Sequence, residues 1–361
     1  MVGIAAFVTG HGYGHAARAC AVLDAVGRRL PGLRAEVFTD APRWFFEASL
    51  DVPVRVHAVR GDVGLVQRNA LDADLDATVS ALDALLPLDD ALVASCAESV
   101  VHTGCRAVLS DIAPLGMVVG RRAGVPTVLV ENFTWDWIYR RLERPPGRLL
   151  DHAGTIAVIN DGVDLRLRAE PVCGDAPGHH VPVIWRRFRR PASAVRRELG
   201  IPSDRAMVLI SMGGARWDVA DVADSGDGPQ VTFVVPGGVS TLPRNGSMIP
   251  LPARSGFHHP DLVAAADVVV GKLGYSTVAE AVGAGTAFAW VPRDDFPESP
   301  VLETFIRGRL PSTRIDRQRF EAGDWRAAID LLLGGDAPRA RAAEINGADV
   351  VADAIVALLD A

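Results

Sequence analysis

Short apolar runs alternate with longer stretches of helical spacing along most of this sequence. Ile4–Val8 is a continuous apolar run that predicts a buried strand, and Ala16–Leu30 repeats apolar residues at the spacing of a helix. One helix is predicted over Asp72–Cys96. Further strands are predicted at Ala35–Phe38, Ala107–Leu109, Thr127–Val130 and Thr155–Ile159. This alternation favours a parallel sheet flanked by helices.

The same pattern begins again in the second half of the sequence. Glycines follow several predicted strands in both halves, which predicts a ligand cleft between two α/β units. Between the halves, the basic run Arg186–Arg190 favours an exposed linker, because charge runs are usually solvated. The alternative is that some of these arginines face the cleft and contact phosphate. The strands predicted here are Met207–Ser211, Val231–Val235, Val268–Val270 and Ala287–Val291, followed by helices at 323–334 and 340–360.

Composition and charge narrow the class of protein. A chain of 361 residues is long enough for two domains, and its 49% apolar and 22% charged residues are ordinary for a soluble globular protein. A net charge of −7 disfavours a nucleic-acid-binding surface. The four cysteines have no CxxC spacing, which favours free thiols in a reducing compartment. Because the N-terminus lacks a basic region and no apolar segment reaches membrane-spanning length, we expect a cytoplasmic protein without stable membrane insertion.

The only lysine of the chain, Lys272, lies in a glycine-rich segment between a predicted strand and a helix that begins near Ser276. Backbone N–H groups converge at such a turn, and the helix dipole favours an anion there. Lysine adds a compact cation on a flexible stem. This segment therefore predicts a phosphate site. The alternative interpretation is a plain strand-to-helix turn in which the lysine is incidental.

A second glycine-rich loop, Gly10–Arg18, follows the first predicted strand and begins the first helix. Its glycines let a ligand approach the backbone, but their spacing is not that of a dinucleotide-binding loop. His15, at the head of the helix, is a candidate general base, since a helix N-terminus favours the neutral imidazole. The alternative is a structural histidine. A metal site made from His11 and His15 is disfavoured, because the intervening glycines keep the two off one regular helical face.

Three further segments carry residues suited to a sugar nucleotide. Glu280 lies one turn beyond Ser276, where its carboxylate serves either a ribose diol or the helix dipole. Acidic residues in Arg293–Glu298, after a predicted strand, are suited to sugar hydroxyls. Asn132–Trp137 combines aromatic rings with a carboxylate, as carbohydrate sites do, although both tryptophans also suit a core.

Taken in order, these segments resemble known groups of proteins. Phe257–Ala281, with Gly285 and Pro292 downstream, resembles the donor domain of GT-B glycosyltransferases of the family 28 group. Gly12–Arg18 also matches the Gly-x-Gly-His-x-x-Arg start of UDP-sugar hydrolases of the pseudaminic acid pathway. A likeness over most of the chain is to the glycosyltransferase-like N-terminal region of L-arabinokinases, carried by Gly10–Arg18, Arg60–Gln67, Ser110–Asp111, Asn132–Tyr139, Gly271–Ala281 and Arg293–Phe296.

The resemblance implies an α/β protein with the GT-B fold, in which two Rossmann-like domains with parallel sheets face each other across a cleft. We expect an acceptor domain at residues 1–180 and a nucleotide-sugar donor domain at 181–361, with the last helix packing back on the first domain. Glu280 would hold the ribose, and backbone near Phe257 would contact the base. The other donor-binding residues implied are Gly12, Gly14, Arg18, Gly213, Gly214, Lys272, Gly274, Tyr275, Ser276 and Thr277 around the diphosphate, with Asp295 and Glu298 at the sugar.

These inferences together predict an enzyme, a glycosyltransferase that moves a sugar from a nucleotide diphosphate to a small-molecule acceptor. The reaction is expected to be inverting and metal-independent, with no cofactor beyond the nucleotide sugar as co-substrate. His15 is the predicted base, with Asp111 or Asp136 as alternatives, and Trp135, Asp136 and Gln67 are the predicted acceptor contacts. Two other functions use the same residues: hydrolysis of the nucleotide sugar by water that His15 activates, and non-catalytic binding. The sequence leaves the base, the sugar, the acceptor and the oligomeric state open.

Overall fold

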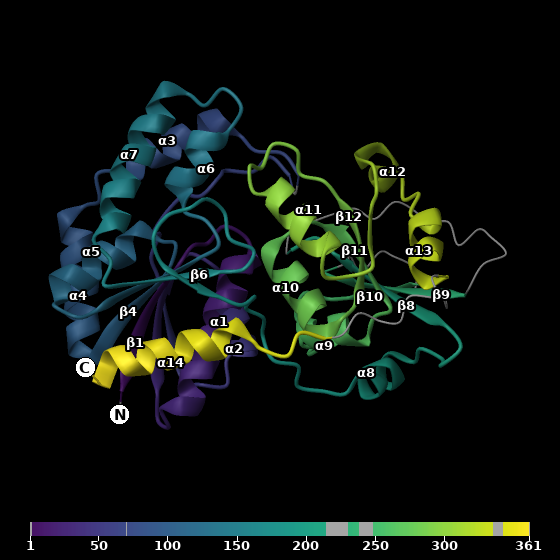
Figure 1. Ribbon diagram of the computed structural model, residues 1–361. Coiled ribbons are helices and arrows are strands. Elements are labelled where there is room, and N and C mark those ends of the chain that lie inside the picture. Colours follow the sequence, from purple (N-terminus) through teal and green to yellow (C-terminus); the bar gives the residue numbers. More distant parts are fainter. Residues whose placement is uncertain (1, 70, 214–229, 238–247, 335–341, 361) are drawn as a thin grey trace.

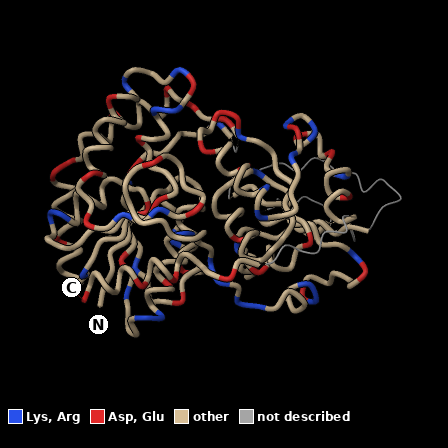
Figure 2. The backbone as a smooth tube through the Cα atoms, viewed as in Figure 1, with Lys and Arg blue, Asp and Glu red and all other residues tan. Residues whose placement is uncertain are grey.

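The computed structural model describes residues 2–69, 71–213, 230–237, 248–334 and 342–360. They form two α/β domains, each with its own parallel sheet (Figure 1). The predicted fold class, two Rossmann-like domains with parallel sheets, is confirmed. Figure 2 shows basic and acidic residues interspersed over both domains.

The first sheet has seven strands in the order β3-β2-β1-β4-β5-β6-β7. Its strands are β1 (Gly3–Val8), β2 (Arg34–Thr39), β3 (Val54–Ala58), β4 (Cys105–Asp111), β5 (Thr127–Glu131), β6 (Leu165–Ala169) and β7 (His179–Val181). The helices between them are α1 (Tyr13–Arg29), α2 (Arg43–Ser49), α3 (Leu75–Leu85), α4 (Asp90–His102), α5 (Pro114–Ala123), α6 (Trp135–Arg141) and α7 (Gly147–Asp161).

Strand β1 lies in the middle of this sheet and is buried on both faces. Because side chains alternate along a strand, Ile4 and Ala6 join a core that includes α1, whereas Ala5 and Phe7 join a second core beneath α4 and α5. This explains why the run at the start of the sequence is continuously apolar.

The second sheet has six strands in the order β10-β9-β8-β11-β12-β13. Its strands are β8 (Ala206–Ser211), β9 (Val231–Pro236), β10 (Met248–Leu251), β11 (Val268–Lys272), β12 (Ala287–Val291) and β13 (Ser312–Arg314). The helices of this half are α8 (Ala192–Leu199), α9 (His259–Ala265), α10 (Tyr275–Ala284), α11 (Ser299–Arg307), α12 (Arg317–Glu321), α13 (Arg326–Leu333) and α14 (Gly347–Asp360).

The last helix, α14, lies against α1 of the first domain (Figure 1, yellow). Val351, Ala352 and Ile355 are buried in the same core as the inner face of α1. The chain therefore crosses between the domains twice, once between β7 and α8 and once before α14.

Three predicted elements differ in the structure, one of them only in its start, since the helix predicted at 340–360 begins at Gly347. Thr155–Ile159 lies in helix α7 and is not a strand, because Leu149, Ala153 and Ile156 bury one helical stripe while Val158 remains 74% exposed. The single helix predicted over Asp72–Cys96 is two helices, α3 and α4, that are separated around Pro87. Proline lacks an N–H group and disfavours the helical conformation of the residue before it.

Candidate active site in the interdomain cleft

A pocket between the two domains is lined by segments that follow the carboxyl ends of strands in both sheets. The first domain contributes the β1–α1 loop and the segment after β5. The second domain contributes Gly213, the β11–α10 turn and the segment after β12. This is the position at which open α/β sheets bind ligands.

The two glycine-rich loops approach each other across the pocket. A Cβ atom placed on Gly14, in the first turn of α1, would lie 3.7 Å from Ser276 Oγ in the first turn of α10. A Cβ atom on Gly12 would lie 3.8 Å from the Gly213 carbonyl oxygen. The N-termini of α1 and α10 therefore point toward one shared space, where their dipoles favour an anion.

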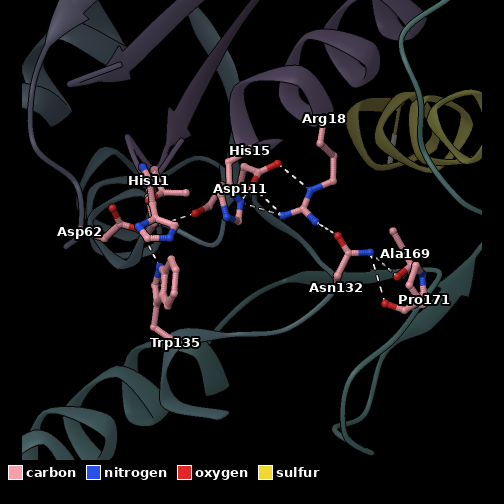
Figure 3. A network of polar contacts seen from close by, with 12 residues as sticks. His11, His15, Arg18, Asp62, Asp111, Asn132, Trp135, Ala169 and Pro171 are labelled. Atoms are coloured by element: carbon pink, nitrogen blue, oxygen red, sulfur yellow. Dashed lines mark hydrogen bonds and ion pairs between the residues drawn. The ribbon is translucent and has the colours of Figure 1, made fainter. Parts of the chain in front are cut away.

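His15 is held by a carboxylate from a neighbouring strand (Figure 3). Its Nδ1 atom lies 2.7 Å from Oδ1 of Asp111, the last residue of β4. Burial lowers the pKa of His15, and the Asp111 carboxylate offsets this only in part. An ionised carboxylate only accepts hydrogen bonds, so Nδ1 carries the proton and Nε2 of the neutral ring has a free lone pair. This is the arrangement of a general base.

Arg18 keeps Asp111 ionised. Its Nε donates to Asp111 Oδ2 at 2.7 Å and its Nη2 donates to Oδ1 at 2.6 Å. Burial by itself would raise the pKa of the Asp111 carboxyl, but Arg18 and His15 outweigh burial and hold that pKa below its usual range. Arg18 also donates to Asn132, whose amide donates to the Ala169 carbonyl at 2.7 Å (Figure 3). Asp111, predicted as an alternative base, thus has both oxygens occupied and serves to orient His15.

A second histidine, His11, lies beside this network. Burial lowers the pKa of His11 well below its usual value, so it too is neutral. Gln67 Nε2 lies 3.2 Å from His11 Nε2, and the ring packs edge-on against Trp135. The indole of Trp135 donates to Asp62 at 2.8 Å, and burial raises the pKa of Asp62 to about 7 (Figure 3). Gln67 and Trp135, predicted as acceptor contacts, both line the pocket.

Lys272 ends strand β11 and faces the pocket. Gly213 has φ of +63°, and a Cβ atom there would come within 2.7 Å of Lys272 Cε, so glycine leaves the space through which the lysine passes. Burial, followed by repulsion from Arg293, lowers the pKa of Lys272 to about 7. An anion bound beside it would restore the charged form.

Glu280, one turn further along α10, is fully buried and already has partners. Arg186 Nε and Nη2 donate to Oε1 at 2.9 and 2.8 Å, and His259 Nδ1 lies 2.7 Å from Oε2. Burial opposes ionisation, but Arg186 and His259 outweigh it and lower the pKa of Glu280 to about 2. The exposed linker predicted for the basic run is therefore wrong for Arg186, which is buried and lines the pocket.

Some predicted residues do not reach the pocket. Asp136 accepts from Arg140 at 3.1 Å and from Asn160 at 3.3 Å, away from the lining. Asp295 is exposed and Phe257 is partly buried against the core of the second domain, while Gly214 lies outside the described residues. The structure does bring together Gly12, Gly14, His15, Arg18, Gln67, Trp135, Gly213, Lys272, Gly274, Tyr275, Ser276, Thr277, Glu280 and Glu298.

The described residues hold neither a cluster suited to a metal ion nor a membrane-spanning helix. They contain no group of three or more histidine, cysteine, aspartate or glutamate side chains suited to a metal ion. Within the same residues, every helix is too short or too polar to cross a membrane.

Comparison with known proteins agrees with the fold. No family model matches the sequence. The chain is 29% identical to the L-arabinokinase of Arabidopsis thaliana over 91% of its own residues and 32% of that protein, so it spans about a third of that relative. It is 24% identical to an uncharacterized glycosyltransferase of Methanopyrus kandleri over 71% of this chain and 77% of that one. The structure of Phytolacca americana UGT2, complexed with UDP-2-fluoroglucose and pterostilbene, superposes with a TM-score of 0.60 at 14% identity and covers both chains fully.

The chain therefore has the GT-B fold of glycosyltransferases. Two of the three resemblances inferred from sequence, to GT-B glycosyltransferases and to L-arabinokinases, are confirmed.

Proposed function

We propose that this chain is a nucleotide-sugar-dependent glycosyltransferase that acts on a small-molecule acceptor with inversion and without a metal ion. One observation supports this most directly. A neutral histidine oriented by a carboxylate, His15 with Asp111, shares a pocket with a lysine at a helix N-terminus, Lys272 with α10. The first pair suits deprotonation of a hydroxyl, and the second suits a departing diphosphate.

In the proposed reaction, Nε2 of His15 takes the proton of an acceptor hydroxyl while the hydroxyl oxygen bonds to the anomeric carbon of the donor sugar. The bond from that carbon to the diphosphate oxygen breaks on the opposite face, which inverts the configuration. Asp111 stabilises the imidazolium that forms. A positioned base contributes a factor of about 10²–10⁴ to the rate.

The departing diphosphate acquires negative charge as the bond breaks. The N–H groups of the first turn of α10 and the ammonium of Lys272 supply positive charge at that place. In this proposal they do the work that a divalent cation does in metal-dependent transfer.

Apolar side chains on the first-domain wall favour an organic acceptor over water. Phe133, Trp135 and Ile138 line the pocket near His15, and Phe133 packs edge-on against the His15 ring with centroids 5.9 Å apart. Gln67 adds a polar group at this wall. A flat molecule with a hydroxyl group fits such a surface. The structure of Phytolacca americana UGT2 contains pterostilbene together with UDP-2-fluoroglucose.

The proposal is tested in two steps. Thermal-shift screening against nucleoside diphosphates and nucleotide sugars identifies the donor, because a ligand that binds only the folded state raises Tm. The purified protein is then incubated with that donor, with and without a panel of hydroxylated aromatic acceptors, and products are separated by mass spectrometry.

Each class of function gives its own product pattern. A glycosylated acceptor supports the proposal. Free sugar released at the same catalytic rate with or without acceptor identifies a hydrolase that uses His15-activated water. Donor binding with no turnover against the whole panel identifies a non-catalytic module.

A further inference from the structure

Two buried side chains from the segment after β12 carry polar atoms that have no partner among the described residues. Arg293 is 7% exposed and Glu298 is 5% exposed, and both line the pocket. The guanidinium is stacked on the Phe296 ring, with its carbon 3.3 Å from the ring centroid, and its Nη1 lies 3.7 Å from Glu298 Oε1. Within the described part of the chain, Arg293 Nε, Arg293 Nη2 and Glu298 Oε2 have no hydrogen-bond partner.

The two free nitrogens form one edge of the guanidinium. Nε and Nη2 point the same way and match the two oxygens of a carboxylate or phosphate. This chain uses that edge elsewhere: Arg18 binds both oxygens of Asp111 through it, and Arg186 binds Glu280 through it. A buried donor without a partner is costly, so the empty edge of Arg293 fits an oxyanion supplied by a ligand.

The carboxylate oxygen Oε2 of Glu298, beside this edge, restricts the chemical class of the ligand further. Glu298 Oε2 can accept a hydrogen bond, whereas a diphosphate ester has only acceptor oxygens to offer. Arg293 with Glu298 therefore matches a group that presents an oxyanion and a hydroxyl together. A sugar that carries a carboxylate has both.

The location of the pair suits the sugar of a bound donor. Strands β11 and β12 are neighbours, with Lys272 opposite Val291, so Arg293 lies two residues beyond the position next to Lys272. Lys272 and Arg293 line the same pocket, and repulsion from Arg293 contributes to the lowered pKa of Lys272. Lys272 with α10 serves the diphosphate in the function proposed above, and Arg293 extends the positive region beyond it.

We propose that Arg293 and Glu298 form the subsite for a uronic acid, with the sugar carboxylate on the Nε/Nη2 edge of Arg293 and a sugar hydroxyl on Glu298. The inference rests on the proposed function, because it takes the ligand to be a nucleotide-diphosphate sugar. It adds the chemical class of the transferred sugar.

The test compares three related ligands by calorimetry. They are the nucleoside diphosphate that the thermal-shift screen selects, its glucosyl ester and its glucuronosyl ester; for a uridine-selective protein these are UDP, UDP-glucose and UDP-glucuronate. The wild type is expected to bind the glucuronosyl ester at least tenfold more tightly than the glucosyl ester. In Arg293→Gln this preference is expected to vanish, while affinity for the nucleoside diphosphate alone changes less than twofold.

Two further variants keep the test independent of folding defects. Arg293→Lys keeps the positive charge but lacks the paired Nε and Nη2 donors. It is therefore expected to lose most of the preference for the glucuronosyl ester over the glucosyl ester. Arg319→Gln removes an exposed arginine of α12, paired with Asp324 outside the pocket, and is expected to behave as the wild type.

Two results would overturn the subsite. One is a wild type without preference for the glucuronosyl ester. The other is tenfold weaker binding of the nucleoside diphosphate alone by Arg293→Gln, because the edge would then bind phosphate. A protein that binds no nucleoside diphosphate contradicts the proposed function itself, which is a different outcome.

Discussion

Side chains from distant positions in the sequence fix the charge state of the pocket. Asp111 is ionised because Arg18 binds both its oxygens, and His15 is neutral because burial outweighs the effect of that carboxylate. Asn132 fixes the far end of Arg18. The network holds the imidazole in the tautomer that leaves Nε2 as a proton acceptor. Lys272 differs, since its pKa of about 7 makes its charge depend on what is bound.

Donor binding at Lys272 should therefore take up a proton. In the free protein the pKa of Lys272 is lowered to about 7, so the amine is mostly neutral at pH 8, and an adjacent diphosphate raises that pKa again. Uptake approaching one proton is expected at pH 8, and affinity should fall as pH rises above 7. A nucleotide sugar is the right ligand, because its diphosphate diester does not titrate near neutral pH.

The measurement is calorimetry of nucleotide-sugar binding in two buffers of different ionisation enthalpy. Lys272→Met, which keeps the length of the side chain, should bind more weakly and take up no proton at pH 8. Equal proton uptake by the variant and the wild type would remove Lys272 from the donor site.

The sequence identifies most of the pocket because glycine-rich loops mark where strands end. Lys272 and His15 both stand out by local pattern and reach one pocket. Ion pairs between residues far apart in the sequence leave no such local signal. The sequence indicates Asp111 only as an alternative base, and the structure is needed to show that Arg18 donates hydrogen bonds to both of its carboxylate oxygens. Arg186 is buried although it lies in a basic run in which Arg187 and Arg189 are exposed, and the run itself does not distinguish them.

Helix α10 connects the pocket to the crossing between the domains. Glu280 binds Arg186, which belongs to the segment between β7 and α8, and Arg186 also donates to Ser49 Oγ at the end of α2, 3.1 Å away. Arg189 in the same segment donates to the Ser49 carbonyl at 2.8 Å. These contacts fix the first domain, the crossing and α10 to one another.

Removing Arg186 should destabilise the fold strongly. Arg186→Gln leaves Glu280 buried without its main partner, and loss of one partner of a buried ion pair costs about 3–5 kcal/mol. The wild-type pKa of Glu280 is lowered from 4.5 to about 2, so this stabilisation is complete above pH 4.5 and is lost as pH falls through 2. The difference in free energy of unfolding between wild type and variant should shrink over that range.

Urea denaturation at several pH values measures this difference. Arg187→Gln is the matched control, because Arg187 is next in the chain, is 59% exposed at its side chain and pairs with Asp349 at 3.4 Å. Its effect should stay within about 0.5 kcal/mol. Equal effects of the two substitutions would contradict the importance of the Glu280 pair.

Elements with strong apolar runs are predictable from sequence, and short or ambiguous ones are not. Strands β1, β4, β8 and β11 are recognisable because each is buried on both faces. Thr155–Ile159 contains β-branched residues and resembles a strand, but its neighbours complete a helical stripe. The short strands β7 and β13, three residues each, carry too little pattern to predict.

In the protein as a whole, the last helix, α14, connects the two domains by packing on the first one. Helix α14 follows the second sheet but packs on α1, whose N-terminus carries His15. Arg29 of α1 pairs with Asp349 of α14 at 3.1 Å beside the apolar contact. The contact links the end of the chain to the helix that positions the proposed base.

Loss of this contact should weaken the first domain. Ile355 is buried in the core shared with α1, so Ile355→Ala should lower the free energy of unfolding by about 2–5 kcal/mol. Leu331→Ala, at a residue of α13 that is 64% exposed, serves as the control, with an expected effect within about 0.5 kcal/mol. Chemical denaturation measures both. A cost at Ile355 no larger than at Leu331 would mean that α14 does not stabilise the domain.

The proposed mechanism requires that His15 acts as a base in the same pocket that binds the donor diphosphate. Measuring kcat and donor affinity for the variant His15→Ala tests this requirement most directly. The variant should lose about 10²–10⁴-fold in kcat, because the acceptor hydroxyl keeps its proton, while donor affinity stays within about threefold of wild type. His102→Ala, at an exposed histidine of α4, should leave both values unchanged. Wild-type turnover in His15→Ala, or a loss confined to donor affinity, would contradict the mechanism proposed for this protein.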